Sequence, residues 1–91
     1  MKDIIEAKLR LNLSPSRIDV EDQSHQHIGH SGWQEGRSTH FEVFIVSNKF
    51  ANQSKVQRHR YIYKILAEEM KSGIHALAIS ALTEDEYSKL L

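Results

Sequence analysis

Residues 54–82 read SKVQRHRYIYKILAEEMKSGIHALAISAL, and this stretch decides the fold class. Its first part has apolar residues at helical spacing, with Ser54 placed to cap the start and Gly73 placed to stop the end. Residues 74–82 are apolar at nearly every position, which predicts a strand that is buried on both faces. We therefore expect a helix over residues 55–71 that leads directly into a strand. The helix is expected to bury a stripe formed by Val56, Ile62, Tyr63, Ile65, Leu66 and Met70.

Another strand is expected just before this helix. In THFEVFIVS, residues 39–47, Phe41, Val43 and Ile45 share one face, and both faces become apolar towards the end. This pattern is typical of a central strand. Because a helix joins it to the strand at residues 74–82, the two strands should run parallel through a right-handed crossover. The turn between strand and helix, NKFANQSK, is expected to contain one helical turn.

The N-terminal part predicts one helix and one further strand. Residues 2–11 show an approximate helical period, and Pro15 cannot continue that helix. Ser14 precedes the proline and is therefore expected to be extended. SRIDVED, residues 16–22, predicts a short strand that pairs antiparallel with the strand at residues 39–47.

A last short helix, EDEYSKLL, is expected after Thr83, which can cap it. The order α-β-β-α-β-α predicts an α+β fold in which helices pack on a three-stranded mixed sheet. The length of 91 residues fits a single domain over residues 1–91 with a modest core. Such a chain has little room for a deep catalytic cleft, and no paired nucleophile and base or phosphate-binding loop is evident, so we expect no enzyme.

Composition narrows the functional classes further. The chain has no cysteine, which excludes disulfides, thiolate nucleophiles and an all-cysteine metal site. Equal numbers of basic and acidic residues give a net charge of zero, which argues against a protein whose main task is to neutralise phosphate. No apolar run approaches the ~20 residues that span a membrane, and the N-terminus resembles no signal or transit peptide. We expect a cytoplasmic protein, although a processed organellar protein would have the same features.

Residues 21–38 predict a long, polar loop that contains SHQHIGHSGW. His25, His27 and His30 lie within six residues and suit a metal site, although a solvated loop explains them as well. The same stretch contains a G-x-x-G, but in nucleic-acid-binding domains this loop lies between helices, so we interpret the match as chance. Trp33 is a candidate contact for a partner or a base.

The helix at residues 55–71 predicts a local basic zone despite the zero net charge. Arg58 and Arg60 point to different sides, and the zone is either a solvated face or a contact for a partner or nucleic-acid phosphate. His59 suits an interface or packing equally, and His40 is expected to be structural at a strand edge. The basic zone comprises Lys49, Lys55, Arg58, Arg60 and Lys64.

Four segments in this order and spacing resemble the BolA family: VEDQSHQHIGH, THFEVFIVSNKF, QRHRYIYKILAEEM and GIHALAISALT. The resemblance implies a class II KH-like fold and partnership with a monothiol glutaredoxin, with which a 2Fe-2S cluster is shared. It implies that the glutaredoxin supplies a cysteine thiolate and the thiolate of bound glutathione, so the isolated chain holds no cluster tightly. It also implies an alternative role, DNA-binding transcriptional regulation that affects stress response and cell shape.

The same resemblance assigns His75 as one cluster ligand and a loop residue as the other. His27 matches the Ser-x-x-His step of the loop, His30 is the substitute, and His25 fits less well. From the residues alone, His75 would instead be a hydrogen-bonded core histidine at the start of a buried strand. The chain departs from the family at Asn52, where a glycine is usual, but asparagine tolerates a left-handed backbone.

A monomer is expected when the chain is free.

Overall fold

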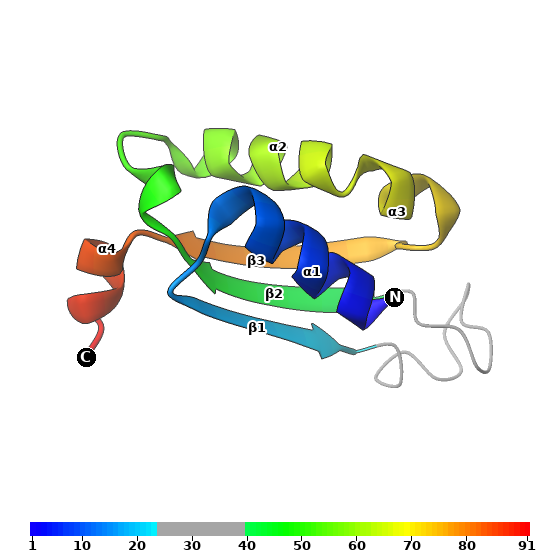
Figure 1. Cartoon of the computed structure of the whole chain (residues 1–91), viewed down its shortest axis with the longest axis horizontal. Helices are drawn as coiled ribbons and strands as arrows, with labels where there is room; N and C mark the ends of the chain where they lie inside the picture. Colours follow the sequence, from blue (N-terminus) through cyan, green and yellow to red (C-terminus); the bar gives the residue numbers. More distant parts are fainter. Residues whose placement is uncertain (24–39) are drawn as a thin grey trace.

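Helices and strands form one mixed sheet with helices on it in the computed structural model, which describes residues 1–23 and 40–91. The strand order is β1-β2-β3, in which β1 and β2 are antiparallel and β2 and β3 are parallel (Figure 1). The expected α+β class, the strand pairing and the central place of β2 are confirmed. The elements are α1 (Lys2–Leu13), β1 (Arg17–Asp22), β2 (His40–Val46), the 3-10 helix η2 (Asn48–Phe50), α2 (Lys55–Ile65), α3 (Ala67–Ser72), β3 (Ala76–Leu82) and α4 (Glu84–Ser88).

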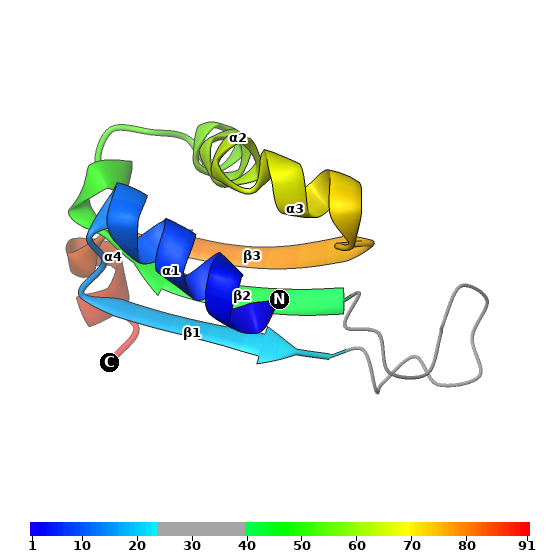
Figure 2. The same cartoon turned by 45° about the vertical axis from the view of Figure 1, so that its right-hand side comes forward.

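The core lies between the sheet and the helices α1, α2 and α3, which cover one of its faces (Figures 1 and 2). Alternate strand residues point into this layer, as the period of two in a strand requires. The apolar residues of α1 and α2 meet them there, and Phe50 of η2 is fully buried. The central core residues are Ile5, Leu9, Leu13, Ile18, Val20, Phe41, Val43, Ile45, Phe50, Ile62 and Leu66.

β3 is not buried on both faces, so that prediction is wrong. Ala76, Ala78 and Ser80 are exposed, whereas Leu77 and Ile79 pack against the core from the other face. β3 is an edge strand, and the helices cover only one face of the sheet along most of its length. Small residues at the exposed positions made the segment look uniformly apolar, because alanine counts as hydrophobic without needing burial.

The expected single helix at residues 55–71 is divided into α2 and α3 by a turn at Leu66. Leu66 is fully buried with φ −99° and ψ 19°. The turn directs α3 so that Glu69 meets Lys8 of α1 at 2.8 Å. Neither glycine nor proline lies at the break, so tertiary packing around the buried Leu66 overrides local propensity here.

The buried stripe of this helical segment is narrower than predicted. Val56 and Tyr63 are 58% and 39% exposed, which contradicts their assignment to the core. Ile62 is fully buried, while Ile65 and Met70 pack against the core from its edge. The break at Leu66 rotates α3 relative to α2, so one continuous helical period cannot describe both.

Most helix caps and turns have the conformations that the sequence predicts. Ser54 and Thr83 form capping boxes. In each box the hydroxyl accepts a hydrogen bond from the backbone N–H three residues further on, and the side chain of that later residue accepts one from the backbone N–H of the serine or threonine. Asn52 has φ 65°, so it takes the left-handed conformation expected for the family's glycine. Ser14 is not extended: it has φ 43° and closes α1 as a left-handed cap, donating its N–H to Arg10 O. This cap bond outweighs the extended preference that Pro15 imposes.

α4 lies at the end of the sheet where β2 and β3 finish (Figure 1). Tyr87 stacks edge-on against Phe44 with ring centroids 5.7 Å apart, on the sheet face opposite the main core. Arg17 of β1 donates to the Tyr87 hydroxyl and lies over both rings. This small cluster covers the end of a face that is otherwise solvated.

Candidate functional site

The site that the sequence singles out lies at the opposite end of the sheet, where β2 and β3 begin. His75 immediately precedes β3, and its side chain is exposed. The alternative of a buried core histidine is therefore wrong for His75. This exposure agrees with its position just before the start of an edge strand.

His40 stands beside His75. The register pairs His40 with Ala76, so the two histidines meet at the starting ends of adjacent parallel strands. Their ring centroids are 5.4 Å apart with the planes tilted by 58°. The sequence analysis interpreted His40 as structural and did not predict that it lies beside His75. Aligning the starts of the two parallel strands would have found it, because both histidines lie within a residue of a strand start.

The other predicted site residues lie outside the described residues. His25, His27, His30 and Trp33 all fall within residues 24–39. At the boundary of this range, Gln23 N–H donates to His40 O at 2.8 Å.

The described residues alone do not provide a complete metal site. Among residues 1–23 and 40–91, no group of three or more His, Asp or Glu side chains is arranged to hold a metal ion. The accessible imidazole of His75 nevertheless has the donor chemistry that suits an iron of a 2Fe-2S cluster, since histidines replace two cysteines in Rieske centres. His75 therefore fits such a group as one ligand among several, with the remaining ligands supplied from elsewhere.

The predicted basic zone is smaller than expected, because Arg58 is not on the surface. Its side chain is 8% exposed and forms an ion pair with Glu86 at 2.6 Å. Its guanidinium also donates to the carbonyls of Ala81 and Gln53. Arg58 is therefore a buried structural residue. Its burial argues against the prediction that it contacts a partner or nucleic acid.

The ion pair with Arg58 shifts the pKa of Glu86. Hydrogen bonds from Arg58, followed by the backbone bond from Thr83, lower the pKa of Glu86 from 4.5 to about 2. The carboxylate thus stays charged in the folded protein at any ordinary pH. This shift has a structural cause and does not mark a catalytic acid.

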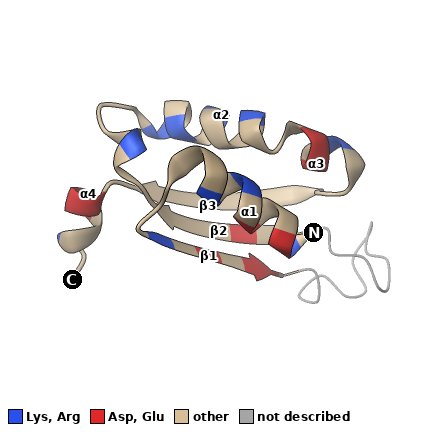
Figure 3. Ribbon diagram, viewed as in Figure 1, with Lys and Arg blue, Asp and Glu red and all other residues tan. Residues whose placement is uncertain are grey.

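The remaining cations of α2 are accessible. Lys55, Arg60 and Lys64 are exposed, His59 is half-buried, and the described helix contains no acidic residue (Figure 3). Lys49 of η2 is also exposed, although its ammonium donates to Asn12 O at 3.0 Å. The α2 surface is therefore basic, as predicted, without the contribution of Arg58.

The junction between α2 and α3 lacks the features of a phosphate-clamping loop. It consists of Leu66 alone, which is buried and flanked by Ile65 and Ala67. A G-x-x-G clamp exposes backbone N–H groups to a nucleic-acid backbone, whereas the N–H of Leu66 donates within the helix to Ile62 O. The G-x-x-G of residues 29–32 lies outside the described residues.

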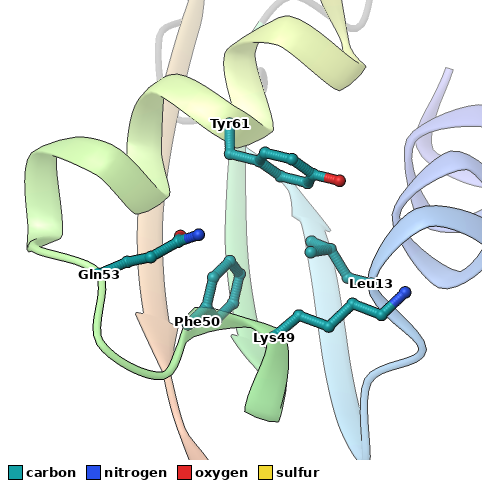
Figure 4. A pocket seen from close by; sticks show the side chains of 5 residues that line it. All are labelled: Leu13, Lys49, Phe50, Gln53 and Tyr61. Carbon is teal, nitrogen blue, oxygen red and sulfur yellow. The ribbon is translucent and has the colours of Figure 1, made fainter.

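A separate hollow of about 290 Å³ lies between the end of α1, η2 and α2 (Figure 4). Leu13 and Phe50 give it an apolar floor, and the side chains of Lys49, Gln53 and Tyr61 surround it. These polar groups do not form a nucleophile and base pair. The hollow is also at the end of the sheet away from His75, so it does not belong to the histidine site.

Comparison with known proteins decides the family. The family model for BolA-like protein matches residues 9–86. The chain belongs to the BolA-like family. This BolA-like chain is 45% identical over 82 residues to chloroplastic Protein BOLA1 of Arabidopsis thaliana, covering 87% of this chain and 51% of that protein. It is also 45% identical over 86 residues to SufE-like protein 1 of the same plant, which is named chloroplastic/mitochondrial, covering 90% of this chain and 23% of that protein.

Bacterial relatives and solved structures agree with this assignment. A protein of Haemophilus influenzae named DNA-binding transcriptional regulator BolA is 41% identical over 87 residues, covering 96% of this chain and 81% of that protein. The solved BolA domain of SufE1 from Arabidopsis thaliana matches with a TM-score of 0.84 at 44% identity, covering 93% of each chain. In the part of this BolA-like chain that the structure describes, no helix is long and apolar enough to cross a membrane.

Proposed function

We propose that this BolA-like chain is a non-enzymatic partner of a monothiol glutaredoxin and co-ligates a bridging 2Fe-2S cluster. Membership of the family, together with the exposed His75 beside His40, carries the proposal. The chain has no cysteine, so thiolate ligands must come from the partner and its glutathione. The role would be trafficking of iron-sulfur clusters or iron sensing.

His75 is the ligand best supported in the described part of the chain. Its ring is accessible to a second protein, and a ligand shared between two proteins must be accessible. Imidazole binds metal only when deprotonated, so complex formation should weaken at acid pH. His40 borders the same site, with its ring centroid 5.4 Å from that of His75.

The second ligand is proposed to be His27, with His30 as the substitute. His27 is preferred because it matches the Ser-x-x-His step of the loop to which the family resemblance assigns a ligand. Both remain proposals because residues 24–39 lie outside the described structure.

Cluster reconstitution tests this function. The full chain is mixed with a monothiol glutaredoxin, iron, sulfide and glutathione, and visible circular dichroism is recorded for the wild type and for His75→Ala, His27→Ala and His30→Ala. We expect a spectrum distinct from that of glutaredoxin alone, which His75→Ala and one loop variant abolish. Lys89→Ala is the control, because Lys89 is exposed just after α4, at the end of the sheet away from His75.

Two results would contradict the proposal. The first is a wild-type mixture whose spectrum equals that of glutaredoxin alone. The second is a heterocomplex spectrum that His75→Ala leaves intact while its far-ultraviolet spectrum shows a folded protein. His75 is exposed, so its truncation should not disturb folding and the second result is readily interpreted.

A second candidate function is DNA-binding transcriptional regulation. The relative from Haemophilus influenzae carries that name, and the accessible cations of α2 suit contact with phosphate. DNA binding of this kind should fall steeply with salt and be insensitive to His75→Ala. Binding to duplex DNA across salt concentration, compared for Arg60→Ala and His75→Ala, separates this candidate from the cluster partner.

A further inference from the structure

The outer edge of β3 is open within the part of the chain that the structure describes. β3 ends the strand order, and none of residues 1–23 and 40–91 forms a strand on its far side. Ser47 N–H donates to Leu82 O at 2.8 Å, so Leu82 directs its carbonyl towards β2. Peptide groups alternate in direction along a strand. The peptide groups of Leu77, Ile79 and Ala81 therefore point away from the sheet.

Two of these outward carbonyls already accept hydrogen bonds from α2. The Tyr63 hydroxyl donates to Leu77 O at 3.3 Å, and the Arg58 guanidinium donates to Ala81 O at 3.0 Å. Both bonds agree with the outward direction of these groups. Ile79 lies between them, and its N–H and C=O have no such partner in the described structure.

A groove of about 240 Å³ opens beside Ile79, between β3 and the first half of α2. Lys55 and His59 line its helical side, one turn apart, and residues 79–82 line its strand side. Lys55 is exposed, so its ammonium is accessible to a ligand in the groove. The groove therefore combines the unpaired peptide unit of Ile79 with the cationic side chain of Lys55.

The charge of this groove has one sign. α2 has no acidic residue, and the nearby carboxylate of Glu86 is already paired with Arg58. Lys55 is consequently not neutralised by its own helix. An occupant with negative side chains is therefore complementary to the groove, whereas a basic occupant would be repelled.

We propose that this groove binds an extended acidic segment of a partner protein, which adds to β3 as a short fourth strand. The backbone of the segment pairs with Ile79, and its acidic side chains face Lys55 and His59. Arg58 closes one end of the open edge, because Glu86 fixes its side chain against Ala81 O. The pairing is therefore limited to a few residues, and it does not depend on the cluster function of His75.

A peptide suits this edge better than a nucleic-acid backbone. The edge presents both a donor and an acceptor at Ile79, and an added strand satisfies both. A phosphodiester backbone supplies only acceptors, so it would leave the outward carbonyl unpaired and facing negative charge.

Nuclear magnetic resonance titration of the full, ¹⁵N-labelled chain tests the proposal. The probe is an acetylated and amidated pentapeptide in which valine and glutamate alternate, and the comparison peptide has lysine in place of glutamate. We expect the glutamate peptide to shift the amide of Ile79 and to slow its hydrogen exchange. Lys55→Glu should weaken binding roughly five- to tenfold.

Lys64→Glu is the matched control, because it makes the same charge change on α2 outside the groove. It should change binding of the glutamate peptide by less than about twofold, since the site is distant and screened by salt. Equal weakening by both variants, an equal response to the lysine peptide, or no response at Ile79 overturns the proposal. So does displacement of the bound peptide from Ile79 by a single-stranded oligothymidine, which would make the groove a nucleic-acid site.

Discussion

Glu86 of α4 binds Arg58 of α2 through two hydrogen bonds, with nitrogen–oxygen distances of 2.6 and 3.1 Å. The same guanidinium donates to Gln53 O and Ala81 O and lies 5.8 Å from the centroid of the Phe50 ring. One side chain thus joins α2, β3, α4 and the turn before α2. The arginine that resembled a surface cation holds the C-terminal helix onto the rest of the fold.

Replacing Arg58 should destabilise the protein far more than replacing its neighbour Arg60. Arg58→Ala leaves two carbonyls without this donor, and we expect the free energy of unfolding to fall by about 2–3 kcal/mol. Arg60 is exposed, so Arg60→Ala should change it by less than about 0.5 kcal/mol. Urea unfolding at pH 7 measures both. Equal effects of the two substitutions would show that the Arg58 network contributes little.

The depressed pKa of Glu86 predicts a specific dependence of stability on acid. The folded pKa is about 2 and the usual value is 4.5, so the folded state favours the carboxylate. Its stabilising contribution is complete above about pH 4.5 and is lost as the pH falls towards 2. Glu86→Gln should remove this part of the profile. Urea unfolding of both proteins between pH 2 and 7 should give curves that converge in acid, and parallel curves would contradict the assignment.

The left-handed backbone at Asn52 predicts opposite outcomes for two small residues. Alanine pays a steric penalty at φ 65°, so Asn52→Ala should lower the free energy of unfolding by about 1 kcal/mol. Glycine adopts this conformation freely, so Asn52→Gly should leave stability within about 0.5 kcal/mol of the wild type. Thermal unfolding of the two variants checks the difference. If the order were reversed, the left-handed turn could not be the cause.

Two residues of α2 test the corrected position of its buried stripe. Ile62 is fully buried, so Ile62→Ala should cost about 3 kcal/mol through lost burial and a residual cavity. Val56 is 58% exposed, so Val56→Ala should change stability by less than about 0.5 kcal/mol. Chemical denaturation of both variants measures the contrast. A large loss for Val56→Ala would favour the wider stripe that the sequence pattern indicates.

Hydrophobic periodicity and turn chemistry predicted much of the fold. The order of elements, the parallel crossover, the central place of β2 and the caps at Ser54 and Thr83 follow from local pattern, and the structure confirms them. Each depends on interactions within a few residues of the chain or on the general handedness of crossovers. The four quoted segments also predicted the BolA-like family, which the comparison confirms.

The candidate site was only partly predictable from the sequence. His75 was selected by its motif, but its exposure depends on how the helices pack on the sheet, which no local pattern reveals. The contact of His40 with His75 needs the register between two strands that are more than thirty residues apart in sequence. The loop histidines remain a prediction from the sequence, because they lie outside the described residues.

The sequence by itself determined the class, the order of the elements and the family, because helical and strand periods and capping residues act locally. The tertiary structure decided what faces solvent. Arg58 is buried because Glu86, 28 residues away, neutralises it there, and the buried Glu69 pairs with Lys8, 61 residues away. The burial of these side chains depends on partners that are distant in the chain. A short window of sequence contains only one member of each pair, so local patterns cannot predict it.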